Sequence, residues 1–478
     1  MRDVEIDAVS LDRLSNLLSV ERAARVAEYT VLARDLLADR VVWNVSSTAS
    51  GGGVAEMLQA LLAYARGAGV DTRWLVLDGT PAFFTVTKRI HNLLHGTPGD
   101  RGDLGAAERA AYDAVLAANA AELTGQVSPG DVVLLHDPQT AGLVEPLREA
   151  GAHVVWRSHI GRDTGNEFTE AGWDFLQRYV EPAEAKVFTR AAYAPAWVSP
   201  EELRIIPPSI DPFTAKNLLL ADPEVHATLR RANLVLLPDM AGQITFTRRD
   251  GSIGTVRDHA KLFATDGPLP GDVRYVLQVS RWDRLKDMAG VLTAFTAHLE
   301  EFPPDVHLVL AGPEVEGVAD DPEGKEVLAE CLDLWRGLPR EARDRVHLAV
   351  LPMDDVDENA HLVNALQQHA DLVVQKSLVE GFGLTVTEPM WKARPLVASR
   401  VGGIQDQIVD GESGLLVADP ADLTGFAAAC VEVLSDSALA DRLGLAARER
   451  VRDLFLGDRQ LIQYVDLFAD LLAAAGAR

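Results

Sequence analysis

Short runs of apolar residues, many of them β-branched, alternate with longer segments in which apolar residues recur every three or four positions. In the first half of the chain these runs are RVVWNVS at 40–46, RWLVLD at 73–78, DVVLLHD at 131–137 and HVVWRSH at 153–159. Continuous apolar runs of this length are typical of parallel strands buried on both faces. The segment between the first two runs has helical spacing from Val54 to Ala65 and stops at Gly69. The pattern therefore predicts a β–α–β unit that repeats along the chain.

A second series of strand patterns begins near residue 273. Its members are VRYVLQVS at 273–280, VHLVLAG at 306–312, VHLAVLP at 346–352, DLVVQKS at 371–377 and PLVAS at 395–399. Helical patterns again separate the strands, which predicts a second sheet of the same kind. The section between the two series, about 207–270, is rich in proline, glycine and charge, and is expected to be a connection with an insertion.

The fold class predicted from this pattern is α/β, with two Rossmann-like, doubly wound domains facing a central cleft. Ligands are then expected at the carboxyl ends of the strands. The predicted N-terminal domain spans 1–212, the connection with its insertion 213–270, and the C-terminal domain 271–455. The last segment, 456–478, is an amphipathic helix that is able to pack back on the N-terminal domain.

The formal net charge of −26 arises from 71 acidic residues against 45 lysines and arginines. So acidic a chain argues against nucleic acid or an anionic membrane as a partner. Two cysteines, Cys331 and Cys430, lie far apart without metal-ligand spacing, which excludes a disulfide scaffold and fits a reducing compartment. No apolar run reaches the length of a signal core or a membrane span. The expected location is the cytoplasm.

Three consecutive glycines, Gly51, Gly52 and Gly53, follow the first predicted strand and precede a predicted helix. Glycines let the backbone approach an anion, and the N–H groups of a helix N-terminus favour negative charge. The run has neither the G-x-G-x-x-G pattern nor the Lys-Ser/Thr of a P-loop. Taken alone, it is as compatible with a structural turn as with a phosphate site.

Two cations, Arg281 and Lys286, lie where the strand VRYVLQVS ends and the next helix begins. A forked guanidinium and a compact ammonium at the end of a strand suit a diphosphate group. The alternative is a solvated turn in which Asp283 and Asp287 are the partners of the two cations. By itself the stretch slightly favours this alternative.

Two glutamates, Glu380 and Glu388, flank the loop GFG (381–383) and the start of a helix expected at about Leu384. That helix would point its N-terminus toward the crevice that the two cations enter. Carboxylates in such a place are suited to accept hydrogen bonds from sugar or ribose hydroxyls. Either glutamate alone would be a capping or solvated acid, but two at this spacing around G-F-G are more specific.

Polar residues also follow two neighbouring strands of the first half, in HDPQT (136–140) and RSHIGRD (157–163). His159 could orient a substrate there, and the alternative is a hydrogen-bonded core histidine. In MDDVDEN (353–359), Asp355 and Asp357 have the spacing of a metal-binding pair. They precede a helix, so capping and compensation of the helix dipole explain them better.

Together these stretches resemble the retaining nucleotide-sugar glycosyltransferases of family four, whose two Rossmann-like domains form the GT-B fold. Glu380 and Glu388 match the E-x7-E signature of that family, SRWDRLK its Arg/Lys diphosphate motif, and SRVGGIQDQIVDGESGLLV (399–417) the stretch that follows. In the first half, NVSSTASGGGVAEML, FFTVTKRIHNLLHG, LHDPQT and PPSIDPFTAKN are similar to the trehalose glycosyltransferring synthases and the retaining trehalose phosphorylases. The segment 218–270 departs from the family because it is longer than expected.

The resemblance implies transfer of glucose from a nucleoside-diphosphate glucose to free glucose, which gives α,α-trehalose. The implied catalytic residues are Arg281, Lys286, Glu380 and His159. The first two are implied to hold the diphosphate, and the last two to lie beside the transferred sugar. The implied donor-binding residues are Gly51, Gly52, Gly53, Gly381, Phe382, Gly383, Leu384, Thr385 and Glu388. Of these, Glu388 is implied to hold the ribose hydroxyls. The implied acceptor-binding residues are Asp137, Lys88, His91 and Asn92. No metal and no further cofactor is expected, because fixed cations and helix N-termini stabilise a leaving diphosphate.

Retention normally suggests a carboxylate nucleophile, but no residue of the sequence is assigned to the opposite face of the sugar. The resemblance implies front-face attack, in which the leaving phosphate takes the acceptor proton. The expected partners are the nucleotide sugar and glucose, and the sequence leaves open a homodimer and the base of the donor. The alternatives are a trehalose phosphorylase, a family-four transferase with another acceptor, and a non-catalytic nucleotide-sugar sensor.

Overall fold

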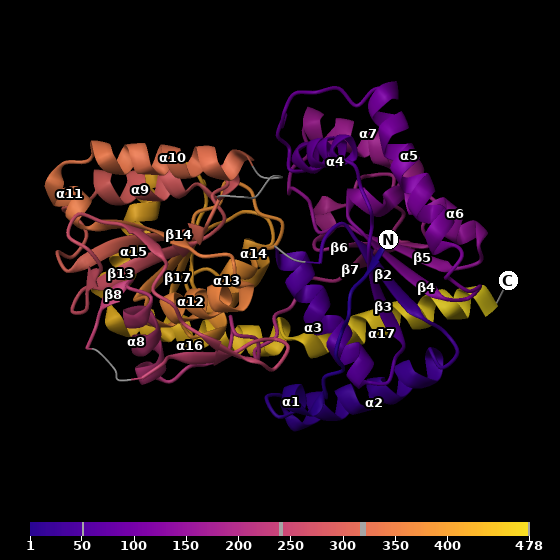
Figure 1. The fold of residues 1–478 in the computed structure, drawn as a ribbon, viewed down its shortest axis with the longest axis horizontal. Helices are drawn as coiled ribbons and strands as arrows, with labels where there is room; N and C mark the ends of the chain where they lie inside the picture. The colour runs from indigo at the N-terminus through magenta and orange to yellow at the C-terminus, as the bar shows by residue number, and fades with distance from the viewer. Residues whose placement is uncertain (50–51, 239–241, 316–321, 477–478) are drawn as a thin grey trace. The chain divides into compact units, whose positions relative to one another are not determined.

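The computed structural model describes residues 1–49, 52–238, 242–315 and 322–476. The chain divides into two compact units, which are drawn in Figure 1. The N-terminal unit consists of Met1–Ser209 and Phe455–Arg478, and the C-terminal unit of Ile210–Leu454. Each unit contains a seven-stranded, almost entirely parallel sheet with helices on both faces. The predicted α/β class with two Rossmann-like domains is therefore confirmed.

The sheet of the N-terminal unit has the order β1-β3-β2-β4-β5-β6-β7, and only β1 runs antiparallel to its neighbour. Its strands are β1 (Arg2–Asp3), β2 (Val42–Ser46), β3 (Thr72–Val76), β4 (Val132–His136), β5 (His153–Arg157), β6 (Ala185–Phe188) and β7 (Leu203–Ile205). Strands β2 and β4 are buried at every position, as continuous apolar runs predict.

The helices of this unit begin where the sequence supplies capping groups. The side chain of Ser19 caps the second helix, and Thr80 followed by Pro81 at the first helical position caps the fourth. The helices are α1 (Asp12–Ser15), α2 (Val20–Leu36), α3 (Gly53–Gly67), α4 (Pro81–Leu94), α5 (Ala106–Leu123), η1 (Pro138–Leu143), α6 (Val144–Glu149), α7 (Glu167–Val180), η2 (Ala191–Tyr193) and α17 (Gly457–Gly476).

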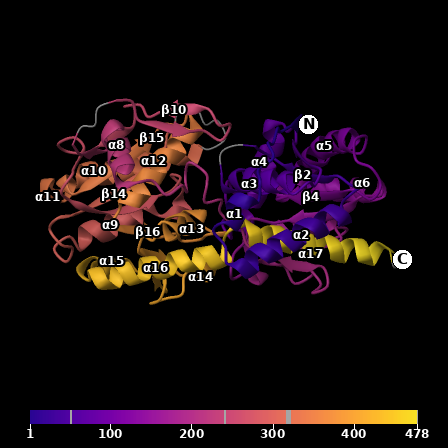
Figure 2. The same ribbon diagram turned by 90° about the horizontal axis from the view of Figure 1, so that it is seen from below.

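The C-terminal helix α17 belongs to the N-terminal unit although the whole C-terminal unit precedes it in sequence. Figures 1 and 2 show it beside α2. Its apolar residues, among them Tyr464 and Phe468, join a core with Val42 of β2 and Leu134 of β4. An ion pair between Arg22 of α2 and Asp458 of α17, 2.7 Å long, fixes the start of the helix.

The sheet of the C-terminal unit has the order β11-β15-β14-β13-β16-β17-β18, and only β11 is antiparallel. The strands of this sheet are β11 (Lys261–Phe263), β13 (Arg274–Val279), β14 (Val306–Pro313), β15 (Val346–Leu351), β16 (Leu372–Gln375), β17 (Leu396–Ser399) and β18 (Leu415–Val417). The helices of the unit are α8 (Asp222–Arg231), η3 (Arg284–Lys286), α9 (Met288–Ala297), α10 (Pro322–Gly337), α11 (Arg340–Asp344), α12 (Val356–His369), α13 (Leu384–Trp391), α14 (Ile404–Gln407), α15 (Leu423–Ser435) and α16 (Ser437–Leu454).

The segment between α8 and β13 is part of the C-terminal unit rather than a free connection. It contains a parallel pair, β8 (Val235–Leu236) and β12 (Leu269–Pro270), and a hairpin, β9 (Thr245–Thr247) and β10 (Ile253–Thr255). Strand β11 then extends the main sheet by pairing with β15. One strand of the insertion therefore forms the edge of the main sheet, and the others form two separate two-stranded sheets.

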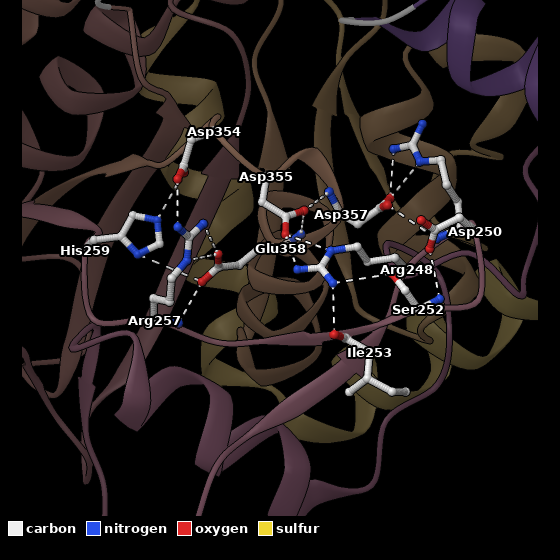
Figure 3. Close-up of polar contacts among 11 residues, drawn as sticks. Arg248, Asp250, Ser252, Ile253, Arg257, His259, Asp354, Asp355, Asp357 and Glu358 are labelled. Atoms are coloured by element: carbon white, nitrogen blue, oxygen red, sulfur yellow. Dashed lines mark hydrogen bonds and ion pairs between the residues drawn. The ribbon is translucent and has the colours of Figure 1, made fainter. Parts of the chain in front are cut away.

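A network of ion pairs, drawn in Figure 3, attaches this insertion to the start of α12. Arg248 contacts Asp355 at 2.7 Å, and Arg257 contacts both Asp354 and Glu358. Asp355 also accepts hydrogen bonds from the N–H groups of Asp357 and Glu358. The interpretation of Asp355 as a helix cap is therefore confirmed, and the arginines of the insertion are additional partners that spacing alone did not indicate.

Among the described residues, no single helix is long and apolar enough to cross a membrane. Helices α15 and α16 meet the length and composition criteria only as a pair, and that pair is bent by 101°.

Candidate functional site

The topology of each sheet defines a switch point, where successive connections leave in opposite directions. In the C-terminal unit this point lies between β13 and β16, which are adjacent in the sheet although the chain visits β14 and β15 between them. Crevices at the carboxyl ends of such strands are the usual ligand sites of doubly wound sheets. The segment 280–287 follows β13 and the segment 376–383 follows β16, so the two predicted motifs meet at the switch point.

The ammonium group of Lys286 lies 2.6 Å from the carboxylate of Glu380. The hydroxyl of Ser377 donates to the same carboxylate oxygen at 3.1 Å. Both charged side chains are largely buried, with 17% of Lys286 and 9% of Glu380 exposed. The sequence predicted that these residues lie near each other, and the structure adds a direct contact. The alternative was a solvated turn in which an aspartate is the partner of Lys286. The structure shows instead that the partner is Glu380.

Arg281 lies differently, because half of its side chain is exposed and its guanidinium contacts Asp283 at 3.3 Å. This contact matches the solvated-turn alternative for that residue. An ion pair so open to solvent is weak, so the contact with Asp283 does not prevent the guanidinium from binding an anion at the carboxyl end of β13.

The loop Gly381–Gly383 leads into the N-terminus of α13. Gly383 is the N-cap residue, has a φ of 85°, and supplies no side chain to cap the helix. A Cβ at Gly403 would lie 2.7 Å from the Cα of Phe382, so glycine is required there for the loop to fit. Gln407 donates to the carbonyl of Phe382 at 2.6 Å. The first N–H groups of α13, which include those of Leu384 and Thr385, therefore form a fixed positive helix end.

Glu388 lies one turn inside α13 and is 3% exposed. It accepts a hydrogen bond from Gln367 of α12 at 3.2 Å, and the ammonium of Lys216 lies 3.8 Å away. Lys392 donates to the same Gln367, and burial lowers the pKa of Lys392 to about 7. Glu388 is thus held by a polar cluster inside the C-terminal unit.

The switch point of the N-terminal unit lies between β2 and β4, and polar side chains gather there. Nε2 of His136 lies 3.1 Å from Oδ1 of Asn44, and Nδ1 of His136 lies 3.1 Å from Nε2 of His159. The Nε–H of Arg157 donates to Nδ1 of His159. Because a guanidinium only donates, His159 must carry its proton on Nε2 and His136 its proton on Nε2. The chain of contacts therefore fixes both tautomers.

Burial makes both imidazoles poor bases. It lowers the pKa of His136 to about 3 and the pKa of His159 well below its ordinary value, with Arg157 acting in the same direction. The interpretation of a hydrogen-bonded core histidine fits His136, which is 1% exposed. His159 retains partial exposure beside Asp137.

Asp137 follows β4 with a φ of 66°, an uncommon conformation for a residue other than glycine. Its carboxylate accepts a hydrogen bond from the N–H of His159 at 2.7 Å. Burial raises the pKa of Asp137 to about 7, and the bond to His159 and the charge of Arg157 oppose this rise. A strained backbone at the end of a strand is typical of functional sites. So is a carboxyl group whose pKa is raised to about 7.

The remaining predicted residues of the N-terminal unit occupy the start of α3 and the second half of α4. Gly51 lies outside the described residues, whereas Gly52 has a φ of 147° and Gly53 begins α3. Lys88, His91 and Asn92 share one side of α4 by their spacing. Of these, Lys88 is exposed and the other two are half-buried. Helix α4 packs against η1, the segment that follows Asp137.

Comparisons with known proteins assign both halves of the chain. Residues 44–195 match the family described as trehalose synthase, N-terminal domain, and residues 263–450 match glycosyl transferases group 1. The chain is 35% identical to a trehalose synthase from Rubrobacter xylanophilus over 96% of its own length and 97% of that protein. The chain belongs to the trehalose synthase family. It is also 27% identical to a trehalose phosphorylase from Pleurotus pulmonarius, over 85% of this chain and 54% of that one.

The fold of this trehalose synthase family member is also that of solved GT-B structures. An α,α-trehalose-phosphate synthase (UDP-forming) from Burkholderia xenovorans superposes with a TM-score of 0.66 at 14% identity, covering 91% of this chain and 100% of that one. The likeness shows the fold alone, and it confirms the predicted GT-B class.

Several side chains of this family member that support the site were not selected from the sequence. They are Asn44, Arg157, Lys216, Gln367, Gln375, Lys376 and Ser377. Gln375 donates to Ser280 and Ser377 and accepts from Thr385, so it joins both switch-point loops. The sequence could have indicated Gln375, Lys376 and Ser377, because they are polar residues at the carboxyl end of an apolar strand pattern, where the crevice lies. Among the described residues, no group of His, Cys, Asp and Glu is arranged to hold a metal ion.

Proposed function

We propose that the chain is a retaining glucosyltransferase that makes trehalose from a nucleoside-diphosphate glucose and free glucose. The observation that carries the proposal is the contact of Lys286 with Glu380 at the uncapped N-terminus of α13, in a chain of the trehalose synthase family. One cation and one helix end suit a leaving diphosphate, and the adjacent carboxylate suits the hydroxyls of the transferred sugar.

The chemistry that these residues serve is the breaking of the bond between C1 of glucose and the diphosphate oxygen. Negative charge then develops on the diphosphate, where Lys286, Arg281 and the N–H groups of residues 381–385 stabilise it without a metal ion. Glu380 binds the donor glucose, and Glu388, with the neighbouring Lys216, binds the ribose. The roles of Arg281, Lys286 and Glu380 are supported by their position after β13 and β16, which are adjacent in the sheet. The role of Glu388 is supported by its place in α13 and its contact with Lys216.

The acceptor glucose is assigned to the N-terminal unit. Asp137 accepts a hydrogen bond from a glucose hydroxyl, and Lys88, His91 and Asn92 of α4 bind further hydroxyls. The family resemblance supports a role for His159 in binding the transferred sugar. In front-face attack the acceptor oxygen forms the new bond to C1, and its proton passes to the departing phosphate oxygen. This route suits His159, whose lowered pKa keeps it neutral and unable to take that proton.

The first test is incubation with glucose and each of ADP-, UDP- and GDP-glucose, with product analysis by NMR. Trehalose formed from one donor without added phosphate supports the proposal. Lack of product from every donor, with a folded protein, would contradict it. Nucleotide binding without any turnover would instead indicate a nucleotide-sugar sensor.

A second candidate function is retaining trehalose phosphorolysis, which the likeness to the Pleurotus pulmonarius enzyme favours. In that reaction inorganic phosphate attacks trehalose and releases glucose 1-phosphate and glucose. Cleavage of trehalose that depends on phosphate and needs no nucleotide would establish it.

The buried thiols of Cys331 and Cys430, which form no disulfide, support a cytoplasmic location for either activity.

A further inference from the structure

The residue after Lys286 is held in an unusual backbone conformation. Asp287 has a φ of 51° and a ψ of 45°, the left-handed region that residues other than glycine rarely adopt. It ends η3 and is also the N-cap of α9. The direction in which the chain leaves Lys286 therefore depends on what stabilises this conformation.

Both oxygens of the Asp287 carboxylate are engaged. Oδ1 accepts from the N–H of Gly290 at 3.1 Å, and Oδ2 accepts from the ammonium of Lys376. A Cβ at Gly290 would lie 2.1 Å from Oδ2 of Asp287, so glycine is required there for the carboxylate to fit. The start of α9 is thus built around this carboxylate.

Lys376 is a buried cation, 1% exposed, at the end of β16. Its backbone N–H donates to Oε1 of Gln278 at 3.0 Å, and the Nε2 of Gln278 donates to the carbonyl of Lys286 at 2.7 Å. Gln278 therefore fixes the carbonyl of Lys286, and Lys376 fixes the residue that follows. A closed ring of contacts runs through Lys286, Gln278, Lys376 and Asp287.

We propose that the buried Lys376–Asp287 ion pair positions the turn that carries Lys286, so that its ammonium reaches the diphosphate of the donor. The inference rests on the proposed function. Lys376 is a positioning residue rather than a catalytic one, because its burial keeps it away from a ligand. A buried pair suits this role, since losing one partner leaves an uncompensated charge in the protein interior.

The test compares Lys376→Met, Asp287→Gly and the double variant. Lys376→Met leaves the Asp287 carboxylate without its cation, and Asp287→Gly leaves the Lys376 ammonium without its anion. The double variant removes both charges and places glycine where φ is positive. Replacing both partners of a buried pair by neutral residues is often nearly neutral for stability. Lys376→Arg is the matched control because it keeps the charge.

The main readout is the affinity for ADP, UDP and GDP by calorimetry, with the KM for glucose and the thermal unfolding temperature measured alongside. We expect Lys376→Met to weaken nucleoside-diphosphate binding about tenfold, a coupling of the size found between contacting residues, with the KM for glucose unchanged. The double variant should recover most of the affinity, and Lys376→Arg should retain most of it.

An unfolding temperature that falls in Lys376→Met while diphosphate affinity stays the same would overturn the inference. A double variant that binds no better than Lys376→Met would do so too. If Lys376→Met does not fold, Gly290→Ala displaces the same carboxylate while both charges remain, and it should weaken diphosphate binding in the same way. A wild-type protein that binds none of the diphosphates contradicts the proposed function itself, and the inference falls with it.

Discussion

Replacing Asp137 by asparagine should change how the stability of the N-terminal unit depends on pH. Burial raises the pKa of this carboxyl from 3.8 to about 7. A raised pKa means that the folded state holds a proton that the unfolded state has lost. The stability from the protonated form is complete below pH 3.8 and disappears as pH rises toward 7. Asparagine has no such proton, so the variant should not lose stability over this range.

The magnitude follows from the shift. One pKa unit corresponds to about 1.4 kcal/mol, so a rise of about three units sets an upper limit near 4 kcal/mol at pH 8. Asp137 is partly exposed, and solvent reduces the effect, so we expect about 2 kcal/mol. The lowered pKa of His136 acts with the opposite sign, because its contribution is present above pH 6.5 and is lost as pH falls toward 3. In the wild type, the fall of stability with pH caused by Asp137 and the rise of stability with pH caused by His136 therefore partly cancel between pH 4 and 6.5.

Hydrogen exchange of the β4 amides, measured between pH 4.5 and 8, tests this prediction without requiring the whole chain to unfold in one step. The difference in opening free energy between Asp137→Asn and wild type should grow with pH, in favour of the variant. A difference that is the same at every pH would reflect only the altered hydrogen bond with the N–H of His159. Such parallel pH curves for the two proteins would show that Asp137 does not titrate in the folded state with a raised pKa.

Three further predictions follow from other contacts. Lys286→Met should lower the rate of glucosyl transfer about 100-fold or more, as loss of one transition-state contact does. It should also lower the free energy of unfolding by about 1.5–3 kcal/mol, because Glu380 loses its cation. Unchanged initial rates of glucosyl transfer would contradict the first expectation. His136→Phe should cost about 1–3 kcal/mol in urea unfolding and release the tautomer of His159, whereas unchanged ring-nitrogen NMR shifts of His159 would count against the fixed tautomers. Arg257→Ala should cost about 1–2 kcal/mol in urea unfolding, reduced by the solvent around the half-exposed arginine, and an unchanged midpoint would show that its ion pairs do not stabilise the insertion.

The sheets were predictable because their strands are continuous apolar runs in the sequence. The run at 40–46 became β2 and the run at 371–377 became β16, since both strands are buried on two faces. The insertion was not predictable in this way. Its strands are two or three residues long, and β11 pairs with β15, which lies far away in sequence. Local periodicity carries no information about such a pairing.

The candidate site was predictable as a set of motifs but not as a set of contacts. Spacing placed Lys286 and Glu380 at the ends of two strands, and the order of the strands in the sheet then brought them together. The partner of Lys376, by contrast, is an aspartate 89 residues away, and its contact depends on a left-handed turn that the residue type does not indicate. Buried polar pairs of this kind require the three-dimensional structure.

We propose that the chain transfers glucose from a nucleoside diphosphate to glucose with retention of configuration. The most direct measurement uses the donor nucleotide sugar labelled with carbon-13 at C1 of glucose, unlabelled glucose as the acceptor, and carbon NMR of the products without added phosphate. We predict α,α-trehalose with the label in one of its two glucose units, and release of the nucleoside diphosphate in equal amount. Label found only in free glucose, in glucose 1-phosphate or in a β-linked disaccharide would contradict retaining transfer to glucose.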